Sequence, residues 1–104
     1  MPERAISVAA DFTRFPAGRY RTDGPFSGQR FREDFLIPPL RAGEMVRVDL
    51  NGTMGFGSSF LEEAFGGLIR EGFDLESLQA LLTFTASDPS LVDEVWEYLF
   101  AAAE

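Results

Sequence analysis

The chain has 104 residues, of which 45% are hydrophobic, and it carries a formal net charge of −8. This length predicts one domain over residues 1–104, and the hydrophobic content, with eleven Phe, predicts a folded core and excludes a disordered chain. The chain has no cysteine and no histidine. This absence excludes disulfides and thiolate metal sites, and it removes the commonest general base and metal ligand. We therefore expect no metal, no cofactor and no enzymatic activity.

The charge is unevenly distributed along the chain. Residues 1–50 carry eight Arg and seven acidic residues, whereas residues 51–104 carry one Arg and ten acidic residues. An acidic half of this kind repels nucleic acid and anionic membranes, so we expect neither as a partner. The sequence contains no apolar run long enough for a membrane span and does not begin like a signal peptide, which predicts a cytoplasmic protein.

The first half of the chain alternates apolar runs with turn residues. Ala5–Ala9 predicts a first strand, and Arg19–Arg21 predicts a second strand at a sheet edge. Ser27 is a suitable cap for a helix, and the Pro38-Pro39 pair is expected to end it. The apolar positions of this helix would be Phe31, Phe35 and Leu36.

The middle of the chain gives the clearest pattern. Val46, Val48 and Leu50 alternate as on one face of a strand over residues 45–50. Ser59 and Glu62 have the spacing of a capping box, which predicts a helix from about Ser59. Gly72 would be its C-cap, and its buried face would consist of Phe60, Ala64, Phe65 and Leu68.

The last third of the chain predicts one more strand and one more helix. Phe73–Ala80 allows either a helical turn or part of a strand, and Leu81–Thr85 favours a buried strand. Asp88-Pro89 is a strong helix start. Strands that alternate with helices indicate an α/β fold, which we expect to be a four- to five-stranded mixed sheet with helices packed on it.

A glycine-rich loop connects the strand over residues 45–50 to the following helix. Asn51-Gly52 ends the strand with turn chemistry, and Gly55 and Gly57 permit conformations that a β-carbon forbids. The loop lies after a strand and before a helix, which is where open α/β sheets place their functional contacts. A phosphate would meet free N–H groups at this helix start, but the loop lacks the lysine and the spacing of a P-loop.

The motif Val48-Asp49-Leu50-Asn51-Gly52, followed by Gly57-Ser58-Ser59 and an apolar helix, resembles the STAS domains of anti-sigma-factor antagonists. In that family a strand ending in Asp-Leu-Ser-Gly leads to a loop with Asp-Ser-Ser-Gly. The core over residues 57–67 more specifically resembles the STAS-like domains catalogued as DUF4325. The resemblance implies a sheet with helices, no catalysis, and protein partners that include kinases or ATPases of the histidine-kinase fold.

The resemblance also implies a set of site residues. The position of the serine that is phosphorylated in the antagonists is Ser58, although Gly57 and Phe60 replace the aspartate and the glycine that flank the family's two serines. We expect a partner to bind the Thr53–Ser59 loop and the first turns of the next helix. The expected contact residues are Thr53, Gly55, Phe56, Gly57, Ser58, Ser59, Glu62 and Glu63.

Other interpretations of the same residues stay open at this stage. Ser58 and Ser59 could simply cap the helix, and the glycine-rich loop could serve a nucleotide-binding or enzymatic subunit. Gly66-Gly67 could allow close packing of the helix on the sheet, or it could form a flat surface for a partner backbone. The arginines and aromatic residues of the first 32 positions fit ordinary salt bridges better than binding of single-stranded nucleic acid.

Overall fold

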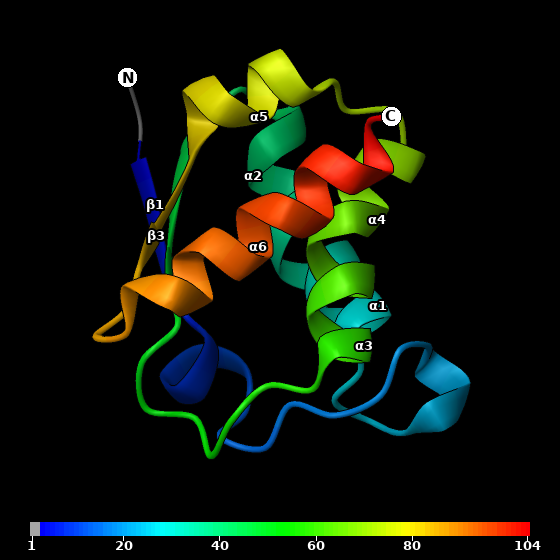
Figure 1. Cartoon of the computed structure of the whole chain (residues 1–104), viewed down its shortest axis with the longest axis vertical. Helices are drawn as coiled ribbons and strands as arrows, with labels where there is room; N and C mark the ends of the chain where they lie inside the picture. Colours follow the sequence, from blue (N-terminus) through cyan, green and yellow to red (C-terminus); the bar gives the residue numbers. More distant parts are fainter. Residues whose placement is uncertain (1–2) are drawn as a thin grey trace.

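Three strands form the sheet of the molecule, whose computed structural model describes residues 3–104. Their order is β1 (Glu3–Ser7), β2 (Met45–Asp49) and β3 (Leu82–Thr85), and both neighbouring pairs are parallel (Figure 1). β2 is therefore the central strand. The α/β class is confirmed, but within the described residues the sheet has three strands and all of them are parallel, so the expected four- to five-stranded mixed sheet is not confirmed.

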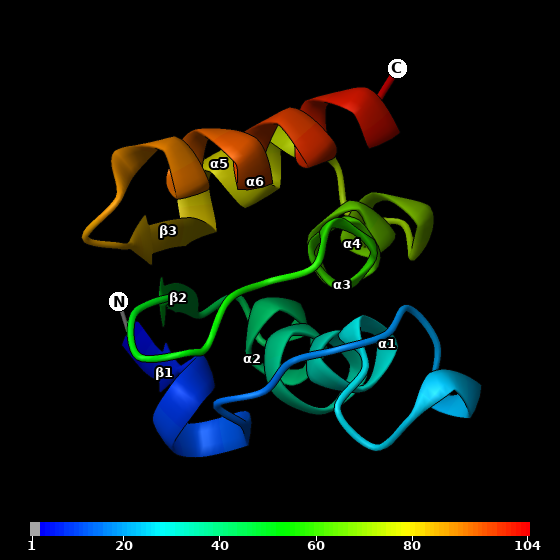
Figure 2. The same cartoon turned by 60° about the horizontal axis from the view of Figure 1, so that its bottom comes forward.

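All helices lie on one face of this sheet (Figure 2). The strands are added in one direction along the sheet, and because parallel crossovers share one hand, each crossover carries its helix to the same side. Side chains along each strand alternate between the buried, helix-covered face and the exposed face. Ile6, Val46 and Val48 are buried on the helix side, whereas Ala5, Arg47 and Thr83 are exposed on the other side.

The first crossover contains a helix that continues past the expected stop. α1 (Gly28–Phe31), the π-helical turn η3 (Arg32–Leu36) and α2 (Ile37–Arg41) follow one another without a break. Pro38 has no N–H to donate and its ring needs room in a helix. The wider π-helical turn ends at Leu36, one residue before the prolines, with the N–H of Ile37 donating to the Arg32 carbonyl, and the chain stays helical to Arg41.

The segment before this helix is irregular. β1 ends at Ser7, and Val8 begins a single π-helical turn, η1 (Val8–Phe12), so the expected strand over Ala5–Ala9 is shifted toward the N-terminus. The expected edge strand Arg19–Arg21 is wrong, because this stretch leads into a 3₁₀ turn, η2 (Arg21–Asp23). Gly18 and Gly24 flank it with φ angles of 92° and 152°, which bend the chain away from a strand.

The second crossover carries the other long helix. α3 (Ser58–Leu61), the π-helical turn η4 (Glu62–Gly66) and α4 (Gly67–Arg70) form one continuous helix, which packs against α1 and against α6 (Pro89–Ala102). The ambiguous stretch from Phe73 forms a short helix, α5 (Leu75–Leu81), capped by the Asp74 side chain. The predicted strand near Leu81 and the predicted helix start at Asp88 are confirmed as β3 and α6.

The core lies between the helices and the inner face of the sheet. The predicted buried face of the 58–70 helix is confirmed, because Phe60, Ala64, Phe65 and Leu68 are at most 1% exposed. Phe65 meets Phe84 of β3 edge-on, with ring centroids 5.2 Å apart. Among the described residues, no helix combines the length and the apolar character needed to cross a membrane.

Candidate functional site

The glycine-rich loop follows the carboxyl end of the central strand, and three hydrogen bonds hold it in place. The Asp49 carboxylate accepts the N–H of Asn51 at 2.9 Å, and the Asn51 side chain accepts the N–H of Ser87 at 2.7 Å. The N–H of Met54 donates to the Arg14 carbonyl at 2.8 Å. These bonds connect the loop to the start of α6 and to the N-terminal segment, so its position is defined by contacts beyond its own sequence.

Only two of the loop glycines are required by the backbone. Gly52 and Gly55 have φ angles of 91° and 122°, a region that side chains with a β-carbon rarely adopt. The prediction that Gly57 also needs such freedom is wrong, because its φ is −74°. A β-carbon on Gly57 would meet nothing within 4 Å, so this glycine keeps the helix entrance open without being needed for the turn.

The helix begins one residue earlier than predicted and without the predicted capping box. Gly57 is the N-cap, and no side chain bonds to the first-turn N–H groups. Ser58 and Ser59 are therefore the first residues inside the helix, and both are exposed. Neither serine is a cap, and Glu62 is directed elsewhere. The helix presents free N–H groups and two hydroxyls to solvent.

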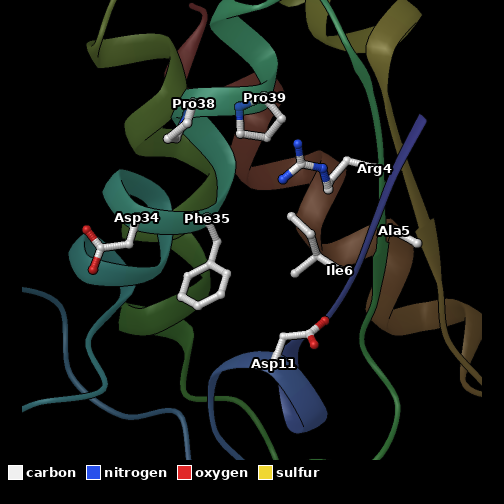
Figure 3. A pocket seen from close by; sticks show the side chains of 8 residues that line it. All are labelled: Arg4, Ala5, Ile6, Asp11, Asp34, Phe35, Pro38 and Pro39. Carbon is white, nitrogen blue, oxygen red and sulfur yellow. The ribbon is translucent and has the colours of Figure 1, made fainter. Parts of the chain in front are cut away.

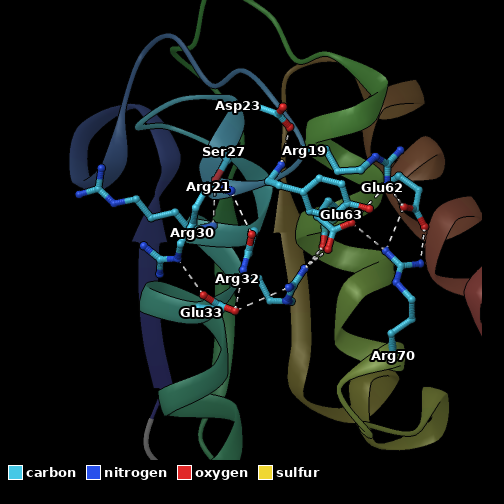
Figure 4. A network of polar contacts seen from close by, with 12 residues as sticks. Arg19, Arg21, Asp23, Ser27, Arg30, Arg32, Glu33, Glu62, Glu63 and Arg70 are labelled. Atoms are coloured by element: carbon cyan, nitrogen blue, oxygen red, sulfur yellow. Dashed lines mark hydrogen bonds and ion pairs between the residues drawn. The ribbon is translucent and has the colours of Figure 1, made fainter.

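Glu62 and Glu63 belong to an ion network on another side of this helix (Figure 4). Glu62 binds Arg19 at 2.5 Å and Arg70 at 2.8 Å, and the Arg70 guanidinium holds the pKa of the Glu62 carboxyl below its usual value despite partial burial. Glu63 is buried and binds Arg32 at 2.8 Å. The structure thus brings residues 53–59 together but separates Glu63 from the exposed surface.

Arg32 was expected in an ordinary surface salt bridge, but it forms the buried ion pair of this network. It is 5% exposed, and its Nη1 donates both to the Glu63 carboxylate and to the Glu63 carbonyl. A β-carbon on Gly67 would overlap the Arg32 guanidinium, and one on Gly66 would crowd the Glu62 carboxylate. Gly67 therefore makes room for the buried Arg32–Glu63 pair between helices, and Gly66 makes room for Glu62, which is neither of the two roles expected from the sequence.

A hollow of about 380 Å³ lies beside the loop at the carboxyl edge of the sheet. Thr53, Gly55 and Phe56 line it from the loop, and Asp88 and Ser90 line it from the start of α6. Asp88 caps α6, and its bonds to the Ser90 hydroxyl and N–H lower the pKa of its carboxyl. The helix-facing part of the loop is apolar, since the Phe56 ring packs 5.8 Å from that of Phe60.

Two large apolar side chains are exposed where the loop meets the N-terminal segment. Met54 is 70% exposed and Phe15 is 63% exposed. The bond from the Met54 N–H to the Arg14 carbonyl holds their two backbones side by side. We call Phe15 and Met54 the apolar pair. Within the described residues, no three His, Cys, Asp or Glu side chains are grouped so that they could hold a metal ion.

The family comparison covers most of these elements. The profile of a STAS-like domain of unknown function (DUF4325) matches residues 27–91, which is more than half of the chain. The chain belongs to this family. Neither a search of curated proteins nor a search of solved structures gave a match.

The limits of the STAS-like match coincide with structural landmarks. The match begins at Ser27, whose hydroxyl caps α1 by accepting the N–H of Arg30, and it ends at Leu91 in the first turn of α6. It includes β2, the glycine-rich loop, the 58–70 helix and β3. β1, Arg19 and Phe15 lie outside the match. The candidate site therefore combines a loop from the STAS-like region with a neighbour that precedes it.

Proposed function

We propose that this STAS-like domain is a non-catalytic, cytoplasmic regulatory module of a bacterial signalling system. It binds a partner protein through the Thr53–Ser59 loop and the first turn of the following helix. The observation that carries the proposal is the exposure of the apolar pair, Phe15 and Met54, of which Met54 lies in the loop that leads to a helix start that no side chain caps. Large exposed apolar side chains on neighbouring segments, next to polar groups, are typical of protein-binding surfaces.

The apolar pair supplies the binding energy in this proposal. Fully burying one Met or Phe side chain contributes about 1.5–3 kcal/mol relative to its exposed state. Methionine is also suited to surfaces that adapt to a partner, because its side chain is flexible and polarizable. The loop backbone that carries Met54 is anchored to Arg14, to Ser87 and to β2, so little ordering is needed on binding.

Ser58 supplies the regulation in this proposal. A phosphate on Ser58 would add a charge of about −1.5 to −2 at the start of a helix, where free N–H groups and the helix dipole favour an anion. The domain would tolerate this charge, whereas a partner with an acidic or apolar surface would have to meet or desolvate it. Glu62 does not blunt the effect, because Arg19 and Arg70 already balance its charge.

The partner class follows from the family resemblance, and we propose a kinase or ATPase of the histidine-kinase fold. The test begins with a pull-down from the native host and continues with titrations of the captured protein against Ser58→Asp and Ser58→Ala. Ser58→Asp should bind more weakly than Ser58→Ala. Ser77→Asp is the matched control, since it adds the same charge in the exposed first turn of α5, away from the loop.

Equal affinities of the two Ser58 variants would remove the switch and leave a static docking surface. The apolar pair is tested separately by Met54→Ser and Phe15→Ser, which should each weaken binding without unfolding the domain, because both side chains are exposed. Unchanged binding by both variants would contradict the proposed surface. A rise in melting temperature with nucleotide alone would favour the alternative, a nucleotide-binding or enzymatic subunit.

A further inference from the structure

An open groove runs between β1 and the 28–41 helix (Figure 3). Its volume is about 440 Å³. Arg4, Ala5 and Ile6 line it from the strand, and Phe35 and Pro39 line it from the helix. Its base is apolar at Ile6 and Phe35, so it can receive alternate side chains of an extended segment.

β1 offers main-chain groups along this groove. Among the described residues it pairs with β2 alone, so its other edge is open. The N–H of Ser7 points to this edge, because it donates to the Asp11 carboxylate at 2.7 Å instead of to β2. Backbone direction alternates along a strand, so Ala5 also directs its N–H and carbonyl to the open edge. An exposed strand edge of this kind is a template for another strand.

The two ends of the groove carry opposite charges. Arg4 lies at the amino end of β1, and its guanidinium extends across the groove toward Pro39 (Figure 3). It contacts Glu44 at 3.3 Å through one nitrogen, and 55% of its side chain stays exposed. Asp11 lies beyond the carboxyl end of β1 and supplies the negative charge at that end. Asp34 also lines the groove from the helix, but Arg21 and Arg30 already pair with its carboxylate.

We propose that this groove binds an extended peptide segment of a partner protein, which adds to β1 as an antiparallel fourth strand. The antiparallel direction places the amino end of the segment beside Asp11 and its carboxyl end beside Arg4. The preferred segment therefore begins with a basic residue, continues with alternating β-branched residues that face Ile6 and Phe35, and ends with an acidic residue. Main-chain bonds supply affinity, and the side chains supply direction.

This proposal is independent of the Thr53–Ser59 loop, and its experiment uses defined peptides. The probe is fluorescently labelled Lys-Val-Thr-Val-Thr-Val-Glu with blocked ends, and its comparison peptide has Lys and Glu exchanged. Anisotropy titrations against the full chain should show that the first peptide binds about threefold to tenfold more tightly, as expected for two exposed ion pairs. Arg4→Glu should reverse or abolish this preference, whereas Glu71→Arg, at an exposed position after the 58–70 helix, should leave it unchanged.

Two further changes test the main-chain pairing. Ala5→Pro removes an outward N–H at an edge position where proline is tolerated, so it should abolish peptide binding and preserve the fold. N-methylation of the second Thr of the peptide, which lies opposite Ala5 when the central Val faces Ile6, removes a donor without altering the protein, and it should weaken binding at least tenfold. This second change keeps the test decisive if Ala5→Pro fails to fold.

Several results would overturn the proposal. These are the absence of binding by either peptide at millimolar concentration, unchanged binding by a folded Ala5→Pro variant, and equal binding of the N-methylated peptide. Equal affinity for the two charge orders would overturn the assigned direction. Dimerisation of the free chain that Ala5→Pro abolishes, measured by sedimentation velocity, would replace the peptide by a second copy of this chain as the occupant.

Discussion

Glu62 and Glu63 are adjacent in the sequence but have different surroundings. Glu62 keeps about a quarter of its side chain exposed between Arg19 and Arg70, whereas Glu63 is buried against Arg32. From the sequence we expected both on a partner-binding surface, because a pair of acidic residues on a helix is ordinarily solvated. The arginines that turn them inward come from positions more than thirty residues earlier and, for Arg70, from the next turns of the same helix. The spacing of residues within the 58–70 helix does not indicate these contacts, because two of the three arginines come from other segments.

Glu62→Gln should change the pH dependence of stability. The lowered pKa of Glu62 means that its ionised form stabilises the fold above its unfolded pKa of about 4.3, and this contribution is lost as the pH falls through the folded pKa. At pH 7 the variant should be less stable by about 1–2 kcal/mol. Urea titrations from pH 7 to pH 3 should show the difference from the native chain shrinking below about pH 4.3. Glu71→Gln, at an exposed position after the same helix, is the control.

Phe65→Ala should be one of the most damaging single substitutions. The ring is fully buried and contacts Phe31 and Phe84, so it links the two long helices to the sheet. Truncation of such a ring costs about 3–5 kcal/mol. Phe100→Ala removes the same group at a position that is 45% exposed and should cost far less. Thermal melts of both variants provide the measurement, and equal melting temperatures would contradict the buried face assigned to the 58–70 helix.

At the level of elements, the close crossing of the 28–41 and 58–70 helices depends on Gly28. A β-carbon there would meet the Phe60 carbonyl oxygen, and it would lie 3.0 Å from the Ala64 backbone nitrogen. Backbone atoms cannot move aside as a flexible side chain can. The glycine therefore sets the distance between the two helices.

Gly28→Ala should destabilise the fold by about 1–3 kcal/mol, the usual cost of overpacking, although alanine is the better helix former. Gly57→Ala is the control, because its surroundings are open and its φ angle is ordinary, so the cost should stay below about 1 kcal/mol. Chemical denaturation of both variants measures the difference. A Gly28→Ala variant as stable as the native chain would mean that the helices can separate without loss.

The elements that the sequence predicted well are those with a strong local period. The strand near Val46 and the helix that buries Phe60 and Phe65 needed only alternation and helical spacing. The Pro38-Pro39 stop failed because a π-helical turn before the prolines removes the conflict, and propensity rules do not anticipate that turn. The Arg19–Arg21 strand failed because Gly18 and Gly24 bend the chain and because the Arg19 carbonyl accepts the N–H of Gln29 in α1.

The parts of the candidate site that were predicted are likewise those with a local sequence pattern. Turn chemistry located the loop at the end of β2, and the position of Ser58 near the helix start followed from the Ser-Ser motif. Phe15 could not be assigned to the site, because its proximity to Met54 depends on one long-range backbone bond at Arg14. Pairing of distant segments is the information that one sequence does not carry.

At the level of the whole molecule, the sheet should differ in stability from its centre to its edges. Among residues 3–104, β2 is paired on both sides, whereas β1 is paired on one. Native-state hydrogen exchange should show the strongest protection at β2 amides such as Val48 and weak protection at Ala5, whose N–H faces the open edge. Protection of Ala5 equal to that of Val48 in the free chain would indicate that the edge is already occupied.

The same three-strand parallel order dictates a sequence of events during synthesis. Glu3 of β1 lies opposite Met45, and Val46 of β2 lies opposite Leu82, so neither pairing can form between neighbouring stretches of chain. Contacts at such separations slow folding, because a long loop must close before any strand bond forms. β1 leaves the ribosome before β2 and β3, so it has no partner strand until β2 has emerged. During that interval its unpaired edge and apolar side chains are open to chaperones and to other nascent chains.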